Sequence, residues 1–73
     1  MSPRLPVVSG KEVIAALVQA GFVEISQRGS YVKLRNAEDR TAIVPLHREL
    51  APGTLRSVLR QAALNVDDFL ALL

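Results

Sequence analysis

The spacing of apolar residues predicts a helix near the start of the chain. Between residues 10 and 20 the apolar side chains recur at helical intervals, as in a helix with one buried face. Ser9 and Glu12 have the spacing of a capping box, in which each side chain bonds the backbone N–H of the other residue. Gly21 can adopt the left-handed conformation that ends a helix. We therefore expect a first helix over residues 10–20.

From Phe22 the spacing changes to alternation, which predicts two strands joined by a tight turn at Arg28-Gly29. The expected partners are Gln27 with Ser30, Ser26 with Tyr31, Ile25 with Val32, Glu24 with Lys33, and Val23 with Leu34. In this register the apolar residues point inward and the polar ones outward, and a slip of one residue would reverse them. The register also predicts a favourable cross-strand pair between Glu24 and Lys33.

A third strand is predicted over residues 41–46, antiparallel to the second. Its register sets Leu34 beside Ala42 and Val32 beside Val44 in the core, with Lys33 beside Ile43 and Tyr31 beside Pro45 on the open face. Pro45 cannot donate to a ladder, so this strand is expected at an edge of the sheet or ending there. If the extended conformation continued to residue 47, His47 would share the face of Tyr31.

Helical spacing returns in the last third of the chain. Thr54 is the expected N-cap of a helix whose inward stripe comprises Leu55, Val58, Leu59 and Ala62. Asn65 is the expected cap of a short last helix. The predicted fold class is α+β, with the order α-β-β-β-α and a short extra C-terminal helix. A three-stranded antiparallel sheet then has helices on one face and leaves the other face open.

Composition and charge narrow the class of protein. The 73 residues fit one domain, 1–73, with an extended lead-in over 1–8. The chain has no cysteine, no signal-peptide pattern and no apolar run of membrane-spanning length, so we expect a cytoplasmic protein without a membrane contact. Residues 28–60 carry seven cations and three carboxylates, a net charge of +4, whereas the remaining residues carry a net −2. A basic middle part suggests a polyanionic partner, although an ordinary solvated surface gives the same pattern.

Few residues of the chain offer catalytic chemistry. The sequence has no glycine-rich phosphate loop, no metal-ligand cluster and no serine–histidine–acid set, so we expect neither metal nor cofactor. Tyr31, Lys33 and Arg35 alternate along one strand, where a ring can stack on a base and cations can contact phosphates. Taken singly, each is also an ordinary exposed strand residue. His47 is the only histidine, and a lone histidine after a strand end is more often a surface residue than a catalyst.

Several segments together resemble a known family. They are Gly21-Phe22, Arg28-Gly29-Ser30 followed by Val32-Lys33-Leu34-Arg35, Val44-Pro45-Leu46-His47, and Gly53-Thr54-Leu55-Arg56-Ser57-Val58-Leu59-Arg60-Gln61-Ala62. From Ser9 onward the chain is similar to the HicA toxin family, the YcfA-like mRNA interferases. The resemblance implies a double-stranded-RNA-binding-like α-β-β-β-α fold. It also implies a metal-independent endoribonuclease that acts without the ribosome, the toxin of a type II toxin–antitoxin system with a HicB-type antitoxin as its partner.

One departure from the family bears directly on activity. In the family a catalytic histidine follows Gly-Ser on the second strand, and here that position holds Tyr31. Histidine exchanges protons near neutral pH, whereas tyrosine side chains have an ordinary pKa of about 10 and are poor bases at pH 7. We therefore expect this form to bind RNA with impaired cleavage. A smaller departure is Ala63, where the family usually has glycine.

The resemblance and the pattern of residues together give a set of candidate site residues. Tyr31 occupies the catalytic position, and His47 is a candidate assistant. The expected RNA-binding residues are Arg28, Gly29, Ser30, Lys33, Arg35, Arg48, Arg56 and Arg60. Tyr31 is then an engineered substitution, a mark of a naturally inactivated relative, or a sign that His47 has taken over acid–base chemistry. The alternative function is a non-catalytic RNA-binding or protein-interaction module of the same fold.

Overall fold

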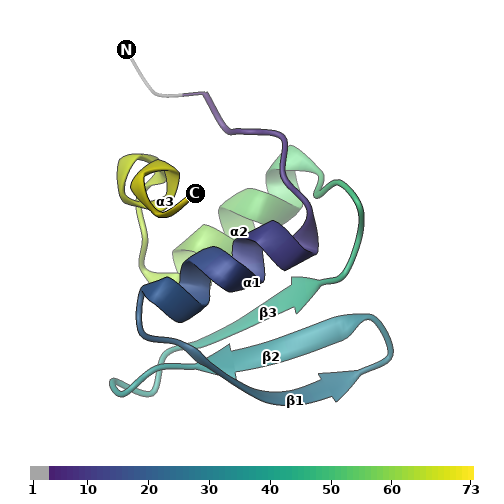
Figure 1. Ribbon diagram of the computed structural model, residues 1–73, viewed down its shortest axis with the longest axis vertical. Coiled ribbons are helices and arrows are strands. Elements are labelled where there is room, and N and C mark those ends of the chain that lie inside the picture. The colour runs from purple at the N-terminus through teal and green to yellow at the C-terminus, as the bar shows by residue number, and fades with distance from the viewer. Residues whose placement is uncertain (1–3) are drawn as a thin grey trace.

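The order of elements is the predicted one. A computed structural model describes residues 4–73, so residues 1–3 of the predicted lead-in lie outside the described part (Figure 1). The elements are α1 (Gly10–Gln19), β1 (Val23–Arg28), β2 (Tyr31–Arg35), β3 (Thr41–Pro45), α2 (Pro52–Ala62) and α3 (Val66–Leu72). The α-β-β-β-α order with a short C-terminal helix is confirmed.

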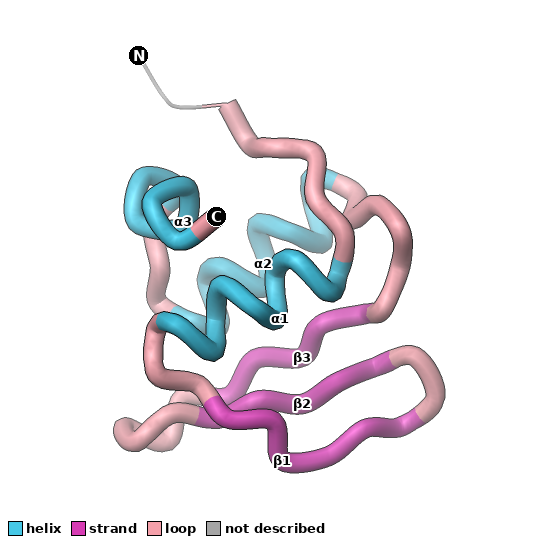
Figure 2. Tube along the Cα trace, viewed as in Figure 1, coloured by secondary structure: helices cyan, strands magenta, loops and turns pink. Residues whose placement is uncertain are grey.

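The strands form one antiparallel sheet in the order β1-β2-β3, and α1 and α2 cover one of its faces (Figures 1 and 2). α3 contacts α1 beside this layer. The core lies between the sheet and the helices, where burial of each large apolar side chain contributes about 1.5–3 kcal/mol. The opposite sheet face has no helix over it, which confirms the α+β class. Among residues 4–73, no helix is long and apolar enough to cross a membrane.

The first helix begins and ends as its sequence predicts. The Glu12 N–H donates to the Ser9 hydroxyl at 3.1 Å, and the Ser9 N–H donates to the Glu12 carboxylate at 3.0 Å, which completes the capping box. Gly21 has a φ of +100°, in the left-handed region that lets the chain leave the helix. The buried face of α1 is thereby aimed at the sheet, with Val13 and Leu17 fully covered.

The expected start of the second helix was wrong. Ala51 is the N-cap and makes no side-chain cap bond, Pro52 is the first helical residue, and Thr54 lies inside the first turn. Proline is favoured at the first helical position because its φ is already helical and the N–H it lacks would have no partner there. The inward stripe is as predicted, with Leu55 and Val58 among the buried residues.

The residue that follows α2 has a backbone conformation that is unusual for alanine. Ala63 follows the helix with a φ of +56°, in the left-handed region where glycine is the usual residue. Its N–H donates to the Arg60 carbonyl, so the helix still closes. After it, Asn65 accepts a bond from the Asp68 N–H at 2.7 Å and caps α3, as predicted. Phe69 of α3 is completely buried.

The register between β2 and β3 matches the prediction. The partners are Tyr31 with Pro45, Val32 with Val44, Lys33 with Ile43, Leu34 with Ala42, and Arg35 with Thr41. Val32 and Val44 are buried under the helices, as are Leu34 and Ala42. Burial alternates along β2 and, as far as Val44, along β3, and Pro45 is also buried where β3 ends. These four apolar residues fix the register, because a slip of one residue would turn them away from the helices.

The register between β1 and β2 differs from the prediction. Arg28 pairs with Tyr31, so the turn is Gly29-Ser30, and a bulge lies between Glu24 and Ser26. The partners are Arg28 with Tyr31, Gln27 with Val32, Ser26 with Lys33, Glu24 with Leu34, and Val23 with Arg35. The predicted pair of Glu24 with Lys33 is not formed. Val23 is 64% exposed and Ile25 is 46% exposed, so neither enters the core. Phe22, just before the strand, is buried in their place.

Candidate nucleic-acid interface

Three rows of paired residues make up the sheet face that has no helix over it, which we call the outer face. Directly paired residues on neighbouring strands point to the same side of a sheet. The rows are Arg28, Tyr31 and Pro45 beside the hairpin turn, then Ser26, Lys33 and Ile43, then Val23, Arg35 and Thr41. These nine residues include three cations and no carboxylate. The outer face is therefore basic.

A half-open hollow of about 820 Å³ lies over the hairpin half of the outer face. Its lining residues are Ser26, Gln27, Arg28, Tyr31, Lys33 and Ile43. Sites for small ligands typically measure about 300–1,000 Å³, a range that suits a single nucleotide. The hollow thus places one aromatic ring and two cations around a space of ligand size.

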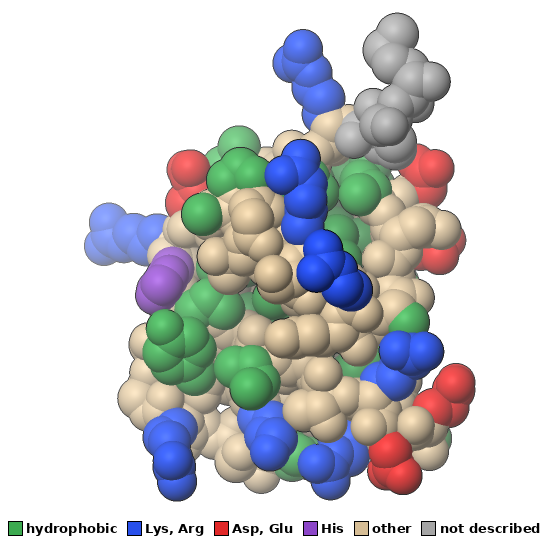
Figure 3. Space-filling view, turned by 180° about the vertical axis from the view of Figure 1, so that it is seen from behind, with side chains coloured by type: hydrophobic (Ala, Val, Ile, Leu, Met, Phe, Trp, Pro, Cys, Tyr) green, Lys and Arg blue, Asp and Glu red, His purple; other side chains and the backbone are tan. Residues whose placement is uncertain are grey.

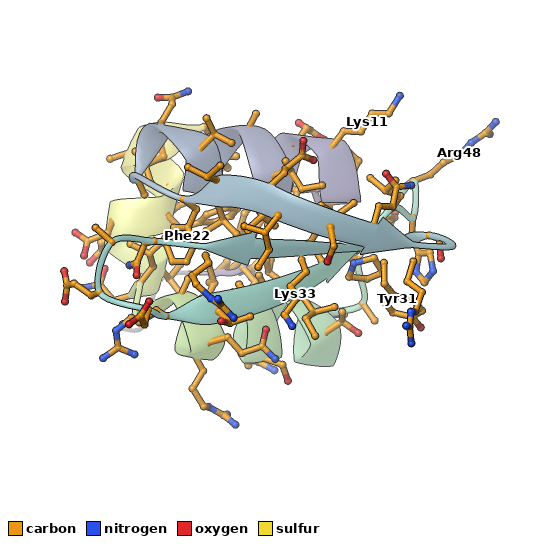
Figure 4. All side chains as sticks on the ribbon, turned by 90° about the horizontal axis from the view of Figure 1, so that it is seen from below. Lys11, Phe22, Tyr31, Lys33 and Arg48 are labelled. Carbon is orange, nitrogen blue, oxygen red and sulfur yellow. The ribbon has the colours of Figure 1, made fainter. Side chains whose placement is uncertain are left out.

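Each of the three predicted strand residues has a distinct setting. Tyr31 stands at the hairpin end of the outer face and is 54% exposed, so its ring is available for stacking. Lys33 is half-buried in the middle row, which fits an aliphatic stem packed between neighbours and a free ammonium group. The Arg35 Nε donates to the Thr41 hydroxyl at 3.2 Å, outside the hollow. Figure 4 shows Lys33 near the centre of the face and Tyr31 at its end.

The predicted turn residues lie beside the hollow. Gly29 has a φ of +60°, which the two-residue turn requires. A residue with a Cβ would be strained in this conformation. The Gln27 side-chain amide donates to the Gly29 carbonyl at 3.0 Å and braces this turn. The Leu46 N–H donates to the Ser30 carbonyl at 2.6 Å, which ties the turn to the end of β3.

The other predicted RNA-binding cations lie apart from the hollow. Arg48 is exposed in the segment after β3, and Figure 4 shows it pointing outward at the margin of the molecule. Arg56 and Arg60 are exposed on α2, as predicted. Figure 3 shows Lys and Arg side chains along the lower edge, where the sheet lies, and others higher, where the helices lie. The structure brings Arg28 and Lys33 together around the hollow but not these three arginines.

His47 follows the end of β3 and is exposed. The bond from Leu46 to Ser30 extends the ladder by one residue beyond Tyr31 and Pro45. The His47 carbonyl accepts a bond from the Gly10 N–H at 2.9 Å, which ties this segment to the start of α1. His47 is not among the residues that line the hollow. Its assignment as an assistant at the site stays a prediction.

Two contributors to this surface were absent from the sequence-based set. Ile43 lines the hollow opposite Lys33, although the pattern had already placed it on the open face. Gln61 of α2 accepts a bond from the Ile43 N–H at 2.9 Å. No periodic signal marks such a residue, because only the docking of α2 against β3 brings the two together. Among residues 4–73 there is no group of metal-ligating side chains that could hold an ion.

Comparison with known proteins agrees with this architecture. A family model described as HicA toxin of bacterial toxin-antitoxin matches residues 10–64, from the first residue of α1 to just beyond α2. A search of curated proteins gave no match to the chain. The matched stretch includes all three strands, the hairpin turn and the residues of the hollow. The chain belongs to the HicA toxin family of bacterial toxin–antitoxin systems.

Proposed function

We propose that this chain is an mRNA-binding toxin of the endoribonuclease type, which holds RNA on its outer face. The observation that carries the proposal is the hollow, where Tyr31 lies among Arg28 and Lys33 on a face without carboxylates. Cations at such a surface replace the counterions of phosphates, and this release drives binding. An exposed ring adds base stacking, worth about 1–3 kcal/mol per base.

The rate at which this chain cleaves RNA depends on the side chain at position 31. The family resemblance assigns catalysis to a histidine at this position, and a general acid–base group contributes about 10²–10⁴-fold to rate. Tyr31 retains a flat ring and a hydroxyl donor at the same exposed place, so stacking and hydrogen bonding to RNA are kept. We therefore expect RNA affinity close to that of a histidine form and cleavage that is slower by at least about 10²-fold.

The partner of a HicA-family toxin is an antitoxin, and here we propose a HicB-type protein. Since the outer face is basic, an acidic antitoxin surface would complement it and would exclude RNA by occupying the same place. Both partners act in the cytoplasm, where mRNA is found. Release of a labelled RNA on addition of the antitoxin would support this arrangement. A ternary complex that still holds uncut RNA would contradict it.

A second candidate function is a module that binds RNA without cutting it. The specific observation in its favour is Tyr31 itself, which keeps the stacking ring and lacks an imidazole. Salt-dependent RNA affinity does not distinguish the two candidates, because both predict phosphate contacts. A gain of cleavage at position 31 does distinguish them.

The test compares the chain with Tyr31→His and Tyr31→Phe on a labelled RNA, with a metal chelator present. Tyr31→His should cleave at least about 10²-fold faster than the Tyr31 form, with similar affinity. Tyr31→Phe keeps the ring and should bind RNA like the unsubstituted chain. If Tyr31→His does not cleave, the module is the correct function. Equal cleavage by the Tyr31 and histidine forms would show that position 31 is not the catalytic one.

A further inference from the structure

We infer that His47 is the general base of this chain, taking the 2′-hydroxyl proton of a ribonucleotide bound at the Tyr31 end of the hollow. The inference rests on the proposed function, because it concerns the RNA held on the outer face. It adds a residue outside the hollow and predicts slow cleavage by the Tyr31 form itself.

The ladder between β2 and β3 brings His47 to this end of the face. Tyr31 pairs with Pro45, and the bond from the Leu46 N–H to the Ser30 carbonyl carries the same register one step further. The residue diagonal to Tyr31 across this pair of strands is therefore His47. Diagonal neighbours in an antiparallel pair lie about 7–8 Å apart, within reach of long and aromatic side chains.

Burial of the neighbouring residues indicates which way the imidazole points. Leu46 packs partly buried against the core, whereas His47 is exposed. In extended chain, consecutive side chains point to opposite sides. Inward packing of Leu46 thus directs His47 away from the core. Figure 3 shows the histidine (purple) at the surface, at the left margin of the molecule.

The backbone around His47 is held at three points. The N–H of Leu46 is bonded to the hairpin turn, and the carbonyl of His47 is bonded to the Gly10 N–H. Gly10 itself packs so closely that a Cβ there would collide with the Pro45 carbonyl oxygen. These contacts fix the backbone from which the exposed imidazole of His47 projects, and a fixed backbone limits where that side chain can reach.

The residues of the outer face and of the hollow include neither a histidine nor a carboxylate. His47 is the only histidine of the chain, and imidazole is the side chain whose ordinary pKa lies closest to neutral pH. The outer face has no carboxylate, and the cations beside Tyr31 are Arg28 and Lys33. These cations suit the phosphate, since they donate hydrogen bonds and stay charged.

The proposed step is an intramolecular transesterification of the RNA, in which side chains of the protein and water exchange the protons. The imidazole of His47 takes the proton of the 2′-hydroxyl, and the 2′-oxygen forms a bond to the adjacent phosphorus. The bond between phosphorus and the 5′-oxygen breaks, and the 5′-oxygen leaves with the electron pair and takes a proton from water. The products are a 2′,3′-cyclic phosphate and a 5′-hydroxyl. Arg28 and Lys33 stabilise the charge on the phosphate during the step.

The experiment measures cleavage of a labelled RNA oligonucleotide, with a metal chelator, by four forms of the full chain. They are the unsubstituted chain, His47→Gln, His47→Ala and Tyr31→His, all purified identically. We expect slow cleavage by the unsubstituted chain and a loss of about 10²-fold or more in His47→Gln. Free imidazole in the buffer should restore part of the activity of His47→Ala, which a merely structural role for His47 would not allow. Circular dichroism and RNA affinity should be unchanged in both His47 variants.

Two results overturn the inference while the proposed function stands. In the first, Tyr31→His cleaves and the unsubstituted chain does not. In the second, Tyr31→His cleaves fastest and His47→Gln cleaves as fast as the unsubstituted chain, so the base is another side chain. If no form binds RNA, or if none cleaves it, the endoribonuclease function fails and the inference fails with it.

Discussion

The backbone N–H of Ile43 donates to the side-chain Oε1 of Gln61 at 2.9 Å, and this bond joins the outer edge of β3 to α2. An edge strand otherwise offers its free N–H groups to other chains. Gln61 satisfies one of them from within the molecule. It also holds Ile43, a lining residue of the hollow, to the helix layer.

Gln61→Ala should therefore loosen this edge without changing the fold. We expect a loss of about 0.5–1.5 kcal/mol in the free energy of unfolding, because one hydrogen bond disappears. Amide hydrogen exchange should become faster at Ile43 than at other residues of β3. Gln19→Ala, at an exposed position at the end of α1, is the matched control and should leave the exchange of Ile43 unchanged. Unchanged exchange at Ile43 in Gln61→Ala would contradict this view of the bond.

Gly10→Ala tests the close approach of α1 to the end of β3. A Cβ at residue 10 would collide with the Pro45 carbonyl oxygen, which is backbone and cannot rotate away. We expect destabilisation of about 1–3 kcal/mol, measured by denaturant unfolding. Gly53→Ala is the control, because no atom lies within 4 Å of a Cβ there. It should be neutral or stabilise α2 by up to about 1 kcal/mol. Equal stability of the two variants would show that the contact at Gly10 is relieved easily.

Ala63→Gly should stabilise the protein. Ala63 has a φ of +56°, and a residue with a Cβ pays for this left-handed conformation, whereas glycine does not. Glycine also makes the unfolded chain more flexible, which offsets part of this effect. We therefore expect the free energy of unfolding to rise by about 0.5–1 kcal/mol. Ala20 has a φ of −81°, at which a Cβ causes no strain. Ala20→Gly should therefore destabilise the protein. Thermal unfolding of the two variants should shift in opposite directions, and a shift in the same direction would rule out relief of strain at residue 63.

Lys33→Gln should weaken RNA binding and flatten its salt dependence. Removal of one phosphate contact lowers the slope of log K against log salt concentration by about 0.7 for single-stranded RNA. Lys11→Gln removes the same charge from α1, on the helix side of the sheet, and should leave the slope unchanged. A fluorescence titration at several salt concentrations measures both. Equal slopes for the two variants would indicate attraction by overall charge instead of contact at the outer face.

The β2–β3 register could be predicted from the sequence because burial alternates along β2 and, as far as Val44, along β3. Val32 and Leu34 face Val44 and Ala42, so no other register would cover them. The β1–β2 register could not be predicted in the same way. The bulge between Glu24 and Ser26 inserts one residue that no pattern marks, and it leaves Ile25 exposed. Alternation predicted that Val23 and Ile25 would be buried, but both lie on the edge strand β1 and remain exposed.

The candidate site was predicted in part. The alternation of Tyr31 and Lys33 was sufficient to place both on the open face, because side chains in a strand alternate strictly. Arg28 was expected within the turn, but it pairs with Tyr31 and lines the hollow. The bond from Ile43 to Gln61 depends on how α2 docks against β3. The cap of α2 is Ala51, three residues before the expected Thr54, because Pro52 begins the helix. These features are set by three-dimensional packing, which spacing along the chain does not record.

Alternation along β2 also has a consequence for how such a toxin can change. Val32 and Leu34 are buried and attach the strand to the core, whereas Tyr31 points away from the core. The residue at position 31 can therefore be replaced with little effect on folding. Under the proposed function, a single codon change at position 31 would switch RNA cleavage off or on and leave the antitoxin-binding surface unchanged. On the same proposal, an inactive copy would compete with active toxin for the antitoxin and so raise the concentration of free active toxin in the cell.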